Sequence, residues 1–232
     1  MIQKPLIILE IANNHMGDLI FGKKIISSYH KTVKPFREFF DFAIKFQFRD
    51  IETFIHPKYI NTNHKQVLRF VETQLTDKEW KELISFSKKK FKIICTPFDE
   101  KSVIKAIKFN FDYIKIASCS ADEWPLLEFL AKKIKNKKVI CSLGGASFSQ
   151  IKKTISFFNN KRINASFLYC VAKYPTNPEN LNLNFFKELR SIYGEQIAGF
   201  STHEMPDENL SGSLALAMGA KIFEKHVSVV SK

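Results

Sequence analysis

The sequence lacks long apolar runs and is poor in cysteine, and each shortage excludes a class of protein. No stretch approaches the ~20 apolar residues that a membrane-spanning helix needs. The apolar run Leu6–Leu9 is cut short by Glu10, so no signal-peptide core is expected either. The 4 cysteines include no CxxC pair, which predicts free thiols in a reducing compartment rather than a disulfide framework or a zinc ribbon. We therefore expect a cytoplasmic protein with no membrane contact.

The composition is that of a folded protein with an excess of positive charge. In 232 residues, 45% are hydrophobic and 25% are charged, which predicts one globular domain over residues 1–232. The 36 basic and 23 acidic residues give a net charge of +13, which favours anionic partners. The lysines are scattered, however, and the densest run, Lys88–Lys90, ends a predicted helix. Without a basic stripe or a known motif, a nucleic-acid partner is not expected.

Short apolar runs alternate with segments of helical periodicity along the whole chain. This alternation predicts a parallel sheet covered by helices on both faces. Eight predicted strands favour a (β/α)8 TIM barrel over an open doubly wound sheet, because residues 12–17 do not match the glycine fingerprint that would follow the first strand of a Rossmann fold. The predicted strands are Leu6–Ile11, Phe42–Gln47, Phe91–Thr96, Tyr113–Ser118, Lys138–Leu143, Ala165–Cys170, Ile197–Thr202 and Lys221–His226.

Two further features of the chain bear on its organisation. The stretch Asp50–Lys65 is a long predicted loop, and a long loop in a compact domain is often functional. The sequence stops at Lys232, six residues after the eighth predicted strand, so the predicted barrel has seven helices and lacks the last one. A groove on the barrel wall would then be uncovered, and we expect a homodimer or a partner chain to fill it.

Polar side chains occur at the carboxyl end of every predicted strand, where TIM barrels carry their active sites. Lys45 and Lys115 are flanked by apolar residues, and a buried lysine is costly unless an anion accompanies it. Hydroxyl groups follow on neighbouring strands, which together with two ammonium groups suit a bound phosphate. These hydroxyl residues are Thr96, Ser118, Ser142 and Ser201.

Two histidines occupy equivalent ends of the last two predicted strands. His203 and His226 would lie on adjacent strands, and two imidazoles, completed by carboxylates and waters, can hold a divalent ion such as Mn²⁺. A single strand histidine is more often structural. The pairing therefore favours a metal site.

A series of short motifs, in order along the chain, resembles the sialic acid (N-acetylneuraminate) synthase family. The motifs are EIANNHMGD at 10–18, IKFQ at 44–47, TPFD at 96–99, KIAS at 115–118, CV at 170–171 with YPT at 174–176, GFSTH at 199–203 and EKH at 224–226. The resemblance implies a condensation of phosphoenolpyruvate with an N-acetylated aldose such as N-acetylmannosamine, dependent on Mn²⁺ or Mg²⁺. The products would be a nine-carbon 2-keto acid and phosphate.

The resemblance also implies roles for individual residues. Lys45, Lys115 and the four hydroxyl residues would hold phosphoenolpyruvate, and His203 and His226 would bind the metal. Gln47 and Tyr174 would contact the sugar, as would Asn61 in the long predicted loop. Glu10 would position or activate water.

The sequence departs from the family pattern at several positions. Cys119-Ser120 stands where the family has Gly-Glu, and Ala172 replaces an asparagine that contacts substrate. From the resemblance we also expect this chain to lack the family's C-terminal antifreeze-like domain. These departures leave a second hypothesis open, in which the chain binds metal and phosphoenolpyruvate but is catalytically impaired, needs a partner chain, or acts only as a binding protein.

Overall fold

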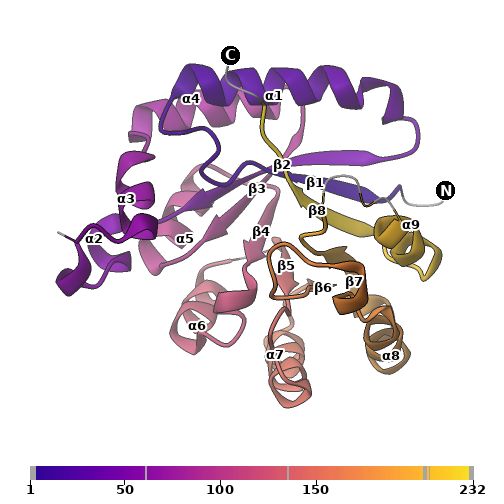
Figure 1. The fold of residues 1–232 in the computed structure, drawn as a ribbon. Coiled ribbons are helices and arrows are strands. Elements are labelled where there is room, and N and C mark those ends of the chain that lie inside the picture. Colours follow the sequence, from indigo (N-terminus) through magenta and orange to yellow (C-terminus); the bar gives the residue numbers. More distant parts are fainter. Residues whose placement is uncertain (1–3, 61, 135, 206–207, 209, 230–232) are drawn as a thin grey trace.

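A computed structural model describes residues 4–60, 62–134, 136–205, 208 and 210–229. Their strands form one closed parallel barrel in which each strand pairs with its neighbours in sequence and β1 pairs with β8 (Figure 1). The (β/α)8 prediction is therefore confirmed. The strands are β1 Leu6–Glu10, β2 Asp41–Phe48, β3 Lys92–Pro97, β4 Tyr113–Ile116, β5 Lys138–Ser142, β6 Ala165–Tyr169, β7 Ile197–Ser201 and β8 Ile222–His226.

The barrel interior changes from apolar to polar along the strands. Side chains alternate across a strand, so residues two apart share a face. The lower interior is a small buried cluster made of Leu6, Ile8, Ala43, Ile94, Ile140 and Leu168. Two residues further along β1, β2, β3 and β5, the same face carries Glu10, Lys45, Thr96 and Ser142, all of them buried. The strand alternation therefore places the predicted polar residues in one layer above an apolar floor.

The helices cover the outside of the barrel, where a much larger apolar cluster fills the space between helices and strands. Several helices begin at residues that cap free backbone N–H groups: Asp18 precedes α1, and Thr76 and Ser147 form capping boxes at the starts of α4 and α7. The helices are α1 Leu19–Val33, α2 Ile51–Phe54, α3 Lys65–Glu72, α4 Asp77–Lys88, α5 Glu100–Lys108, α6 Trp124–Lys133, α7 Phe148–Asn160, α8 Leu183–Tyr193 and α9 Leu210–Ala217.

Two local expectations need adjustment. The predicted long loop over Asp50–Lys65 contains the short helix α2 and a 3-10 turn over Pro57–Tyr59 before α3 begins. The fourth strand ends at Ile116 rather than Ser118, because the chain turns into a 3-10 helix over Ser118–Ser120.

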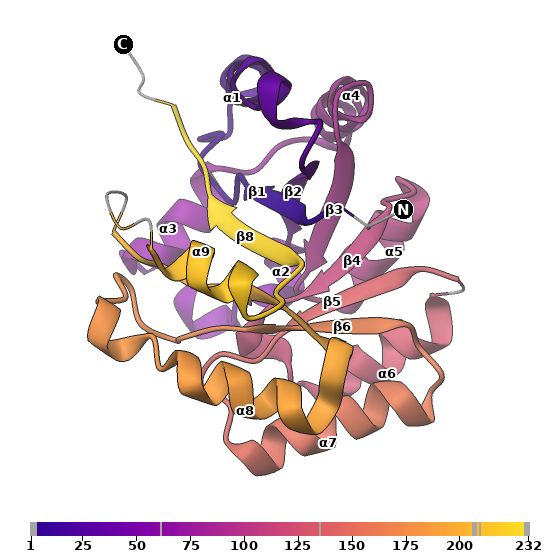
Figure 2. The same cartoon turned by 90° about the vertical axis from the view of Figure 1, so that its right-hand side faces the viewer.

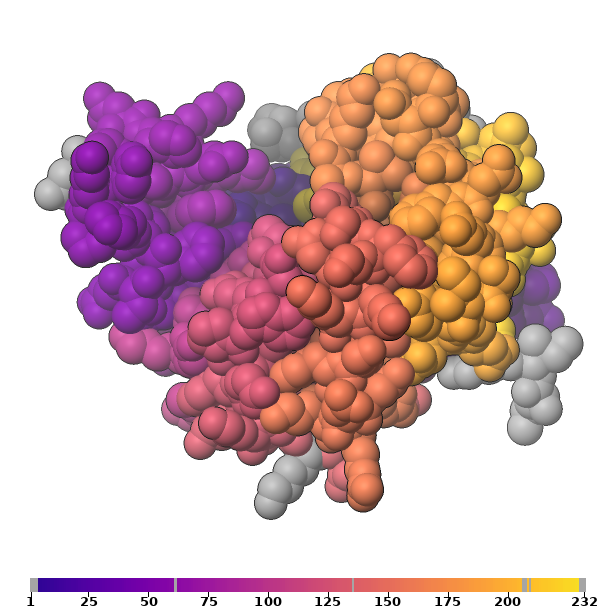
Figure 3. Space-filling view, turned by 90° about the horizontal axis from the view of Figure 1, so that it is seen from below, coloured from indigo at the N-terminus to yellow at the C-terminus, as the bar shows by residue number. Residues whose placement is uncertain are grey.

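The arrangement of helices leaves two features of the surface visible. Figure 2 shows β8 facing the viewer between α9 and α1, and no helix follows β8 in the part of the chain that the structure describes. Figure 3 shows a hollow between the purple segment that holds α2 and α3 and the orange segment that follows β6. Among the described helices, none is both long and apolar enough to cross a membrane.

Candidate active site

The site is assembled by the register of the barrel strands. Glu10, the last residue of β1, is in register with Lys45 on one side and with His226 on the other. Gln47 is in register with Thr96 of β3. Residues that are far apart in the sequence are thereby brought to the same end of the barrel.

Lys45 is almost fully buried and is held by two carboxylates and a hydroxyl. Its Nζ forms ion pairs with Glu10 and, at 3.0 Å, with Glu224 Oε1, and it donates to Thr96 Oγ1 at 3.2 Å. Burial lowers the pKa of Lys45, but the Glu10 and Glu224 carboxylates raise it by more, so the net pKa lies above the ordinary lysine value. Lys45 is therefore a permanent cation with its own counter-ions.

Lys115 is equally buried but touches only neutral groups. Its Nζ donates to Ser142 Oγ at 2.7 Å and to the Ile116 carbonyl at 2.8 Å. Burial lowers the pKa of Lys115, and the charge of Glu224 opposes this. No described carboxylate lies within ion-pair distance of it. A buried ammonium without a direct counter-ion is the kind of group that an incoming anion stabilises.

Glu224 is a candidate site residue to which the sequence pattern assigned no role. Burial alone would raise the pKa of Glu224. The charges of Lys115 and Lys45 lower this pKa by more than burial raises it, so the carboxyl is held below its usual range and is ionised. Ser201 Oγ lies 3.4 Å from its Oε1, and its other oxygen, Oε2, is buried without a hydrogen-bond partner among the described residues. The signal in the sequence was a charge inside an apolar strand, two residues before His226 on the same face.

The neighbouring strand ends bring a serine and a glycine into close contact. Ser118 Oγ accepts a hydrogen bond from the Gly144 N–H at 3.0 Å. A Cβ at Gly144 would lie 2.8 Å from Cys170 Sγ and 2.9 Å from Ser118 Oγ. An alanine at this position would therefore have to displace the side chains of Cys170 and Ser118.

The two predicted metal histidines lie side by side. The ring centroids of His203 and His226 are 5.4 Å apart at an interplanar angle of 32°, and the ring of Tyr174, itself 78% exposed, lies 5.1 Å from that of His203. Burial and the neighbouring His226 lower the pKa of His203, which favours the neutral imidazole that metals bind. No set of three His, Cys, Asp or Glu in the described residues is arranged to hold an ion.

The histidine pair nevertheless fits a divalent ion. Two neutral imidazoles can provide two ligands, and oxygen atoms of water and substrate can complete the shell. The orphaned, ionised Oε2 of Glu224 lies two residues from His226 along β8 and could accept a hydrogen bond from such a water.

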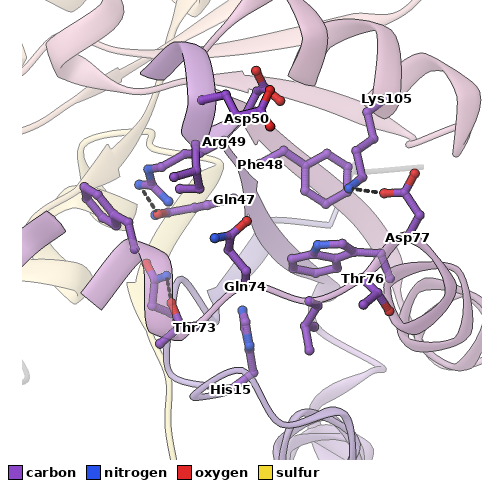
Figure 4. A pocket seen from close by; sticks show the side chains of 16 residues that line it. His15, Gln47, Phe48, Arg49, Asp50, Thr73, Gln74, Thr76, Asp77 and Lys105 are labelled. Carbon is purple, nitrogen blue, oxygen red and sulfur yellow. Dashed lines mark hydrogen bonds and ion pairs between the residues drawn. The ribbon is translucent and has the colours of Figure 1, made fainter. Parts of the chain in front are cut away.

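The predicted sugar contacts are less closely grouped. Gln47 Oε1 accepts a hydrogen bond from Arg49 Nη2 at 2.6 Å. A cavity of about 320 Å³ begins at these two residues (Figure 4). Among the predicted site residues that the structure describes, Gln47 alone lines it. The prediction for Asn61 lies outside the described residues.

A comparison with models of protein families matches the NeuB family over residues 41–232. The chain belongs to the NeuB family. This confirms the resemblance drawn from the short motifs, since the matched region includes the lysines, the hydroxyl residues and both histidines. The roles of the individual residues remain predictions.

Relatives and solved structures agree with this membership. The chain is 33% identical to an uncharacterized protein of Methanocaldococcus jannaschii, over 96% of this chain and 62% of that protein. It is 32% identical to the N,N'-diacetyllegionaminic acid synthase of Campylobacter jejuni, over 98% of this chain and 68% of the relative. The crystal structure of a spore coat polysaccharide biosynthesis protein E from Chromobacterium violaceum matches with a TM-score of 0.92 and 41% identity, covering 98% of this chain and 67% of that one. The chain thus spans about two thirds of the length of these relatives.

Proposed function

We propose that this NeuB-family chain condenses phosphoenolpyruvate with an N-acetylated aldose, giving a nonulosonate and phosphate. The observation that carries the proposal is the buried charge layer at the barrel mouth, in which Lys45 contacts Glu224 and the charge of Lys115 also acts on this carboxylate. His226 lies two residues further along the same strand, and its ring is beside that of His203. The name of the C. jejuni relative, a synthase of a nonulosonic acid, supports this reaction class.

The charge layer suits an enol phosphate. Lys115 has no direct counter-ion and can take a phosphate or carboxylate oxygen, with Ser142 as a neighbouring donor. Lys45 stays protonated because Glu10 and Glu224 raise its pKa. The net charge of +13 would draw the anionic substrate towards the mouth.

In the reaction, carbon three of phosphoenolpyruvate bonds to the aldehyde carbon, and water adds at carbon two. Glu10 would accept a proton from that water, and collapse of the tetrahedral intermediate breaks the carbon–oxygen bond to phosphate. A divalent ion such as Mn²⁺ or Mg²⁺, bound by His203 and His226, would polarise the aldehyde oxygen.

The test is release of phosphate from isotope-labelled phosphoenolpyruvate in the presence of Mn²⁺ and an added N-acetylhexosamine. We expect release that needs the metal and the aldose together, and that Lys115→Met abolishes. Absence of release with every hexosamine, while phosphoenolpyruvate still binds, would contradict the proposal.

That contrary result would favour the second candidate, a binding protein without catalysis. Ser120 supports this alternative, because a buried serine stands where the family pattern has a glutamate. Calorimetry would then detect binding of phosphoenolpyruvate without turnover. The expectations of a homodimer or partner chain and of a cytoplasmic location stay predictions.

A further inference from the structure

Arg49 is a half-buried cation without a counter-ion at the edge of the site. Its guanidinium carbon lies 4.0 Å from the ring centroid of Phe98 and 4.4 Å from that of Phe70, so aromatic rings stabilise its charge. Its one hydrogen bond to a described residue is to the neutral amide of Gln47, and its Nε has no partner. No ion pair joins Arg49 to a described carboxylate.

This environment leaves the charge of Arg49 poorly compensated. Burial lowers its pKa to about 10, although the more distant Glu10 carboxylate opposes the shift. A guanidinium has five N–H donors in a planar fork, which suits a phosphate or carboxylate. Lys45, by contrast, already has two carboxylates in direct contact.

The cavity beside Arg49 is lined by many polar groups, and most of the carboxylates that line it are already paired with lysines. Figure 4 shows the side chains of Gln47, Gln74 and His15 around it. Three carboxylates line it, but Asp50 and Asp77 are bound by Lys101 at 2.7 Å and Lys105 at 2.6 Å, and Glu52 is exposed to solvent. Its volume of about 320 Å³ is at the lower end of the range for small-molecule sites.

We propose that Arg49 receives an anionic substituent, a phosphate or a carboxylate, carried by the acceptor aldose, and makes this chain select charged over neutral acceptors. The inference rests on the proposed function, because it takes the cavity at Gln47 as the acceptor site. The Lys45 and Lys115 layer serves phosphoenolpyruvate, and Arg49 serves the second substrate.

The test compares three aldoses by calorimetry, with Mn²⁺ present and phosphoenolpyruvate absent so that no turnover occurs. The probes are N-acetylmannosamine, its 6-phosphate, and the corresponding uronate, which separate a neutral, a phosphorylated and a carboxylated acceptor. We expect one of the charged aldoses to bind the unaltered protein at least tenfold more tightly than the neutral one. In Arg49→Met, which retains a side chain able to pack on the phenyl rings, the ratio should fall to about one, and Arg49→Lys should restore part of it.

Arg37 offers a matched control. Its guanidinium carbon also lies over a phenyl ring, that of Phe91 at 5.1 Å, its Nη2 also has a neutral partner, the Lys90 carbonyl, and its Nε is also unpartnered. Arg37 precedes β2, whereas Arg49 follows it, so the two arginines lie at opposite ends of the barrel. Arg37→Met should therefore leave the ratio of affinities unchanged, although it removes an equivalent charge.

Each outcome decides the inference. Equal affinity for charged and neutral aldoses, failure of both charged aldoses to bind, or a preference that survives in Arg49→Met would overturn it. Phosphate release with neutral aldoses alone would leave the proposed reaction standing while the inference fails. Charged aldoses that bind through Arg49 without any phosphate release would uphold the inferred site and contradict the reaction.

Discussion

At the scale of single residues, the two buried lysines differ in what surrounds them. Lys45 neutralises Glu10 and contacts Glu224, so its charge is part of the folded structure. Lys115 contacts only a hydroxyl and a carbonyl. Two lysines with similar sequence contexts should therefore respond differently to the same substitution.

We expect Lys45→Met to destabilise the fold by about 3–5 kcal/mol, because it leaves two carboxylates buried without their partner. Lys115→Met removes a buried charge that has no direct ion-pair partner, although its charge also acts on Glu224. It should therefore destabilise the fold much less than Lys45→Met, while binding of phosphoenolpyruvate is lost. Urea unfolding and calorimetry of both variants measure this contrast. Equal destabilisation by the two substitutions would contradict it.

His15 provides a pH-dependent contribution outside the charge layer. It is buried against Trp80, and burial lowers its pKa from 6.5 to about 4. In the unfolded chain His15 binds a proton below pH 6.5, whereas in the folded chain it stays neutral down to about pH 4. The contribution of His15 to the free energy of unfolding is therefore fully present above pH 6.5, and it declines by about 3 kcal/mol as the pH falls to 4.

His15→Gln should remove the part of the decline in the free energy of unfolding that comes from His15. Urea unfolding at several pH values between 4 and 6.5 measures this decline. His64→Gln, at an exposed position before α3, serves as the control and should retain the full slope. If His15→Gln retained the same slope as the unaltered protein, this account of His15 would be wrong.

The sequence predicted the residues whose type is unusual for their place. A lysine in an apolar strand indicates an anion nearby, which is how Lys45 and Lys115 were found. The sequence did not predict that Glu224 would interact with the charges of both lysines, because the partner of a charge depends on strand register. Arg49 was missed for the same reason: its aromatic contacts come from α3 and from the residue after β3, which only the folded chain brings together.

At the scale of elements, β7 and β8 approach each other closely at Gly199. A Cβ there would lie 2.2 Å from the Ile222 carbonyl oxygen and 2.5 Å from Leu168 Cδ2. Both contacts are with neighbouring strands, and the first is with backbone, which cannot turn aside. The strand pair that carries the two histidines therefore depends on the absence of a side chain at this position.

Gly199→Ala should lower the free energy of unfolding by about 2 kcal/mol, because an added methyl group overpacks the strand pair. Gly212→Ala, in α9, is the matched control: a Cβ there meets nothing within 4 Å, and alanine should stabilise the helix by up to about 1 kcal/mol. Thermal unfolding of both variants measures the difference. A Gly199→Ala variant as stable as Gly212→Ala would contradict the close approach.

Element boundaries followed the sequence closely where apolar runs were long and less well where local turns intervened. The fourth strand was predicted two residues too long because Ala117 and Ser118 continue its pattern, yet the backbone turns into a 3-10 helix there. The short helices after β2 could not be predicted from periodicity, since α2 has only four residues, barely one turn.

At the scale of the whole molecule, the barrel is not uniformly covered. The strand β8 is in register with β1 over five residue pairs and with β7 over three, but no helix follows β8 in the described chain (Figure 2). Less cover lowers the free energy of local opening. The two sides of the barrel should therefore open independently and at different rates.

Hydrogen exchange followed by mass spectrometry should show faster exchange for amides of β8 than for those of β3. Gly199→Ala should widen the difference by accelerating β8, and Gly212→Ala should leave it unchanged. Protection of β8 equal to that of β3 would show that the barrel opens as one cooperative unit.

Closure of the barrel joins the two most distant parts of the chain, since Leu6–Glu10 is in register with Ile222–His226. During synthesis on the ribosome, one edge of β1 has no neighbouring strand to pair with until β8 has been made. Glu224 reaches Lys45 only then, so the buried charge layer is incomplete until the last strand is in place. A translation product that stopped before residue 222 would have an open sheet with an unpaired edge strand, and it would be prone to aggregate.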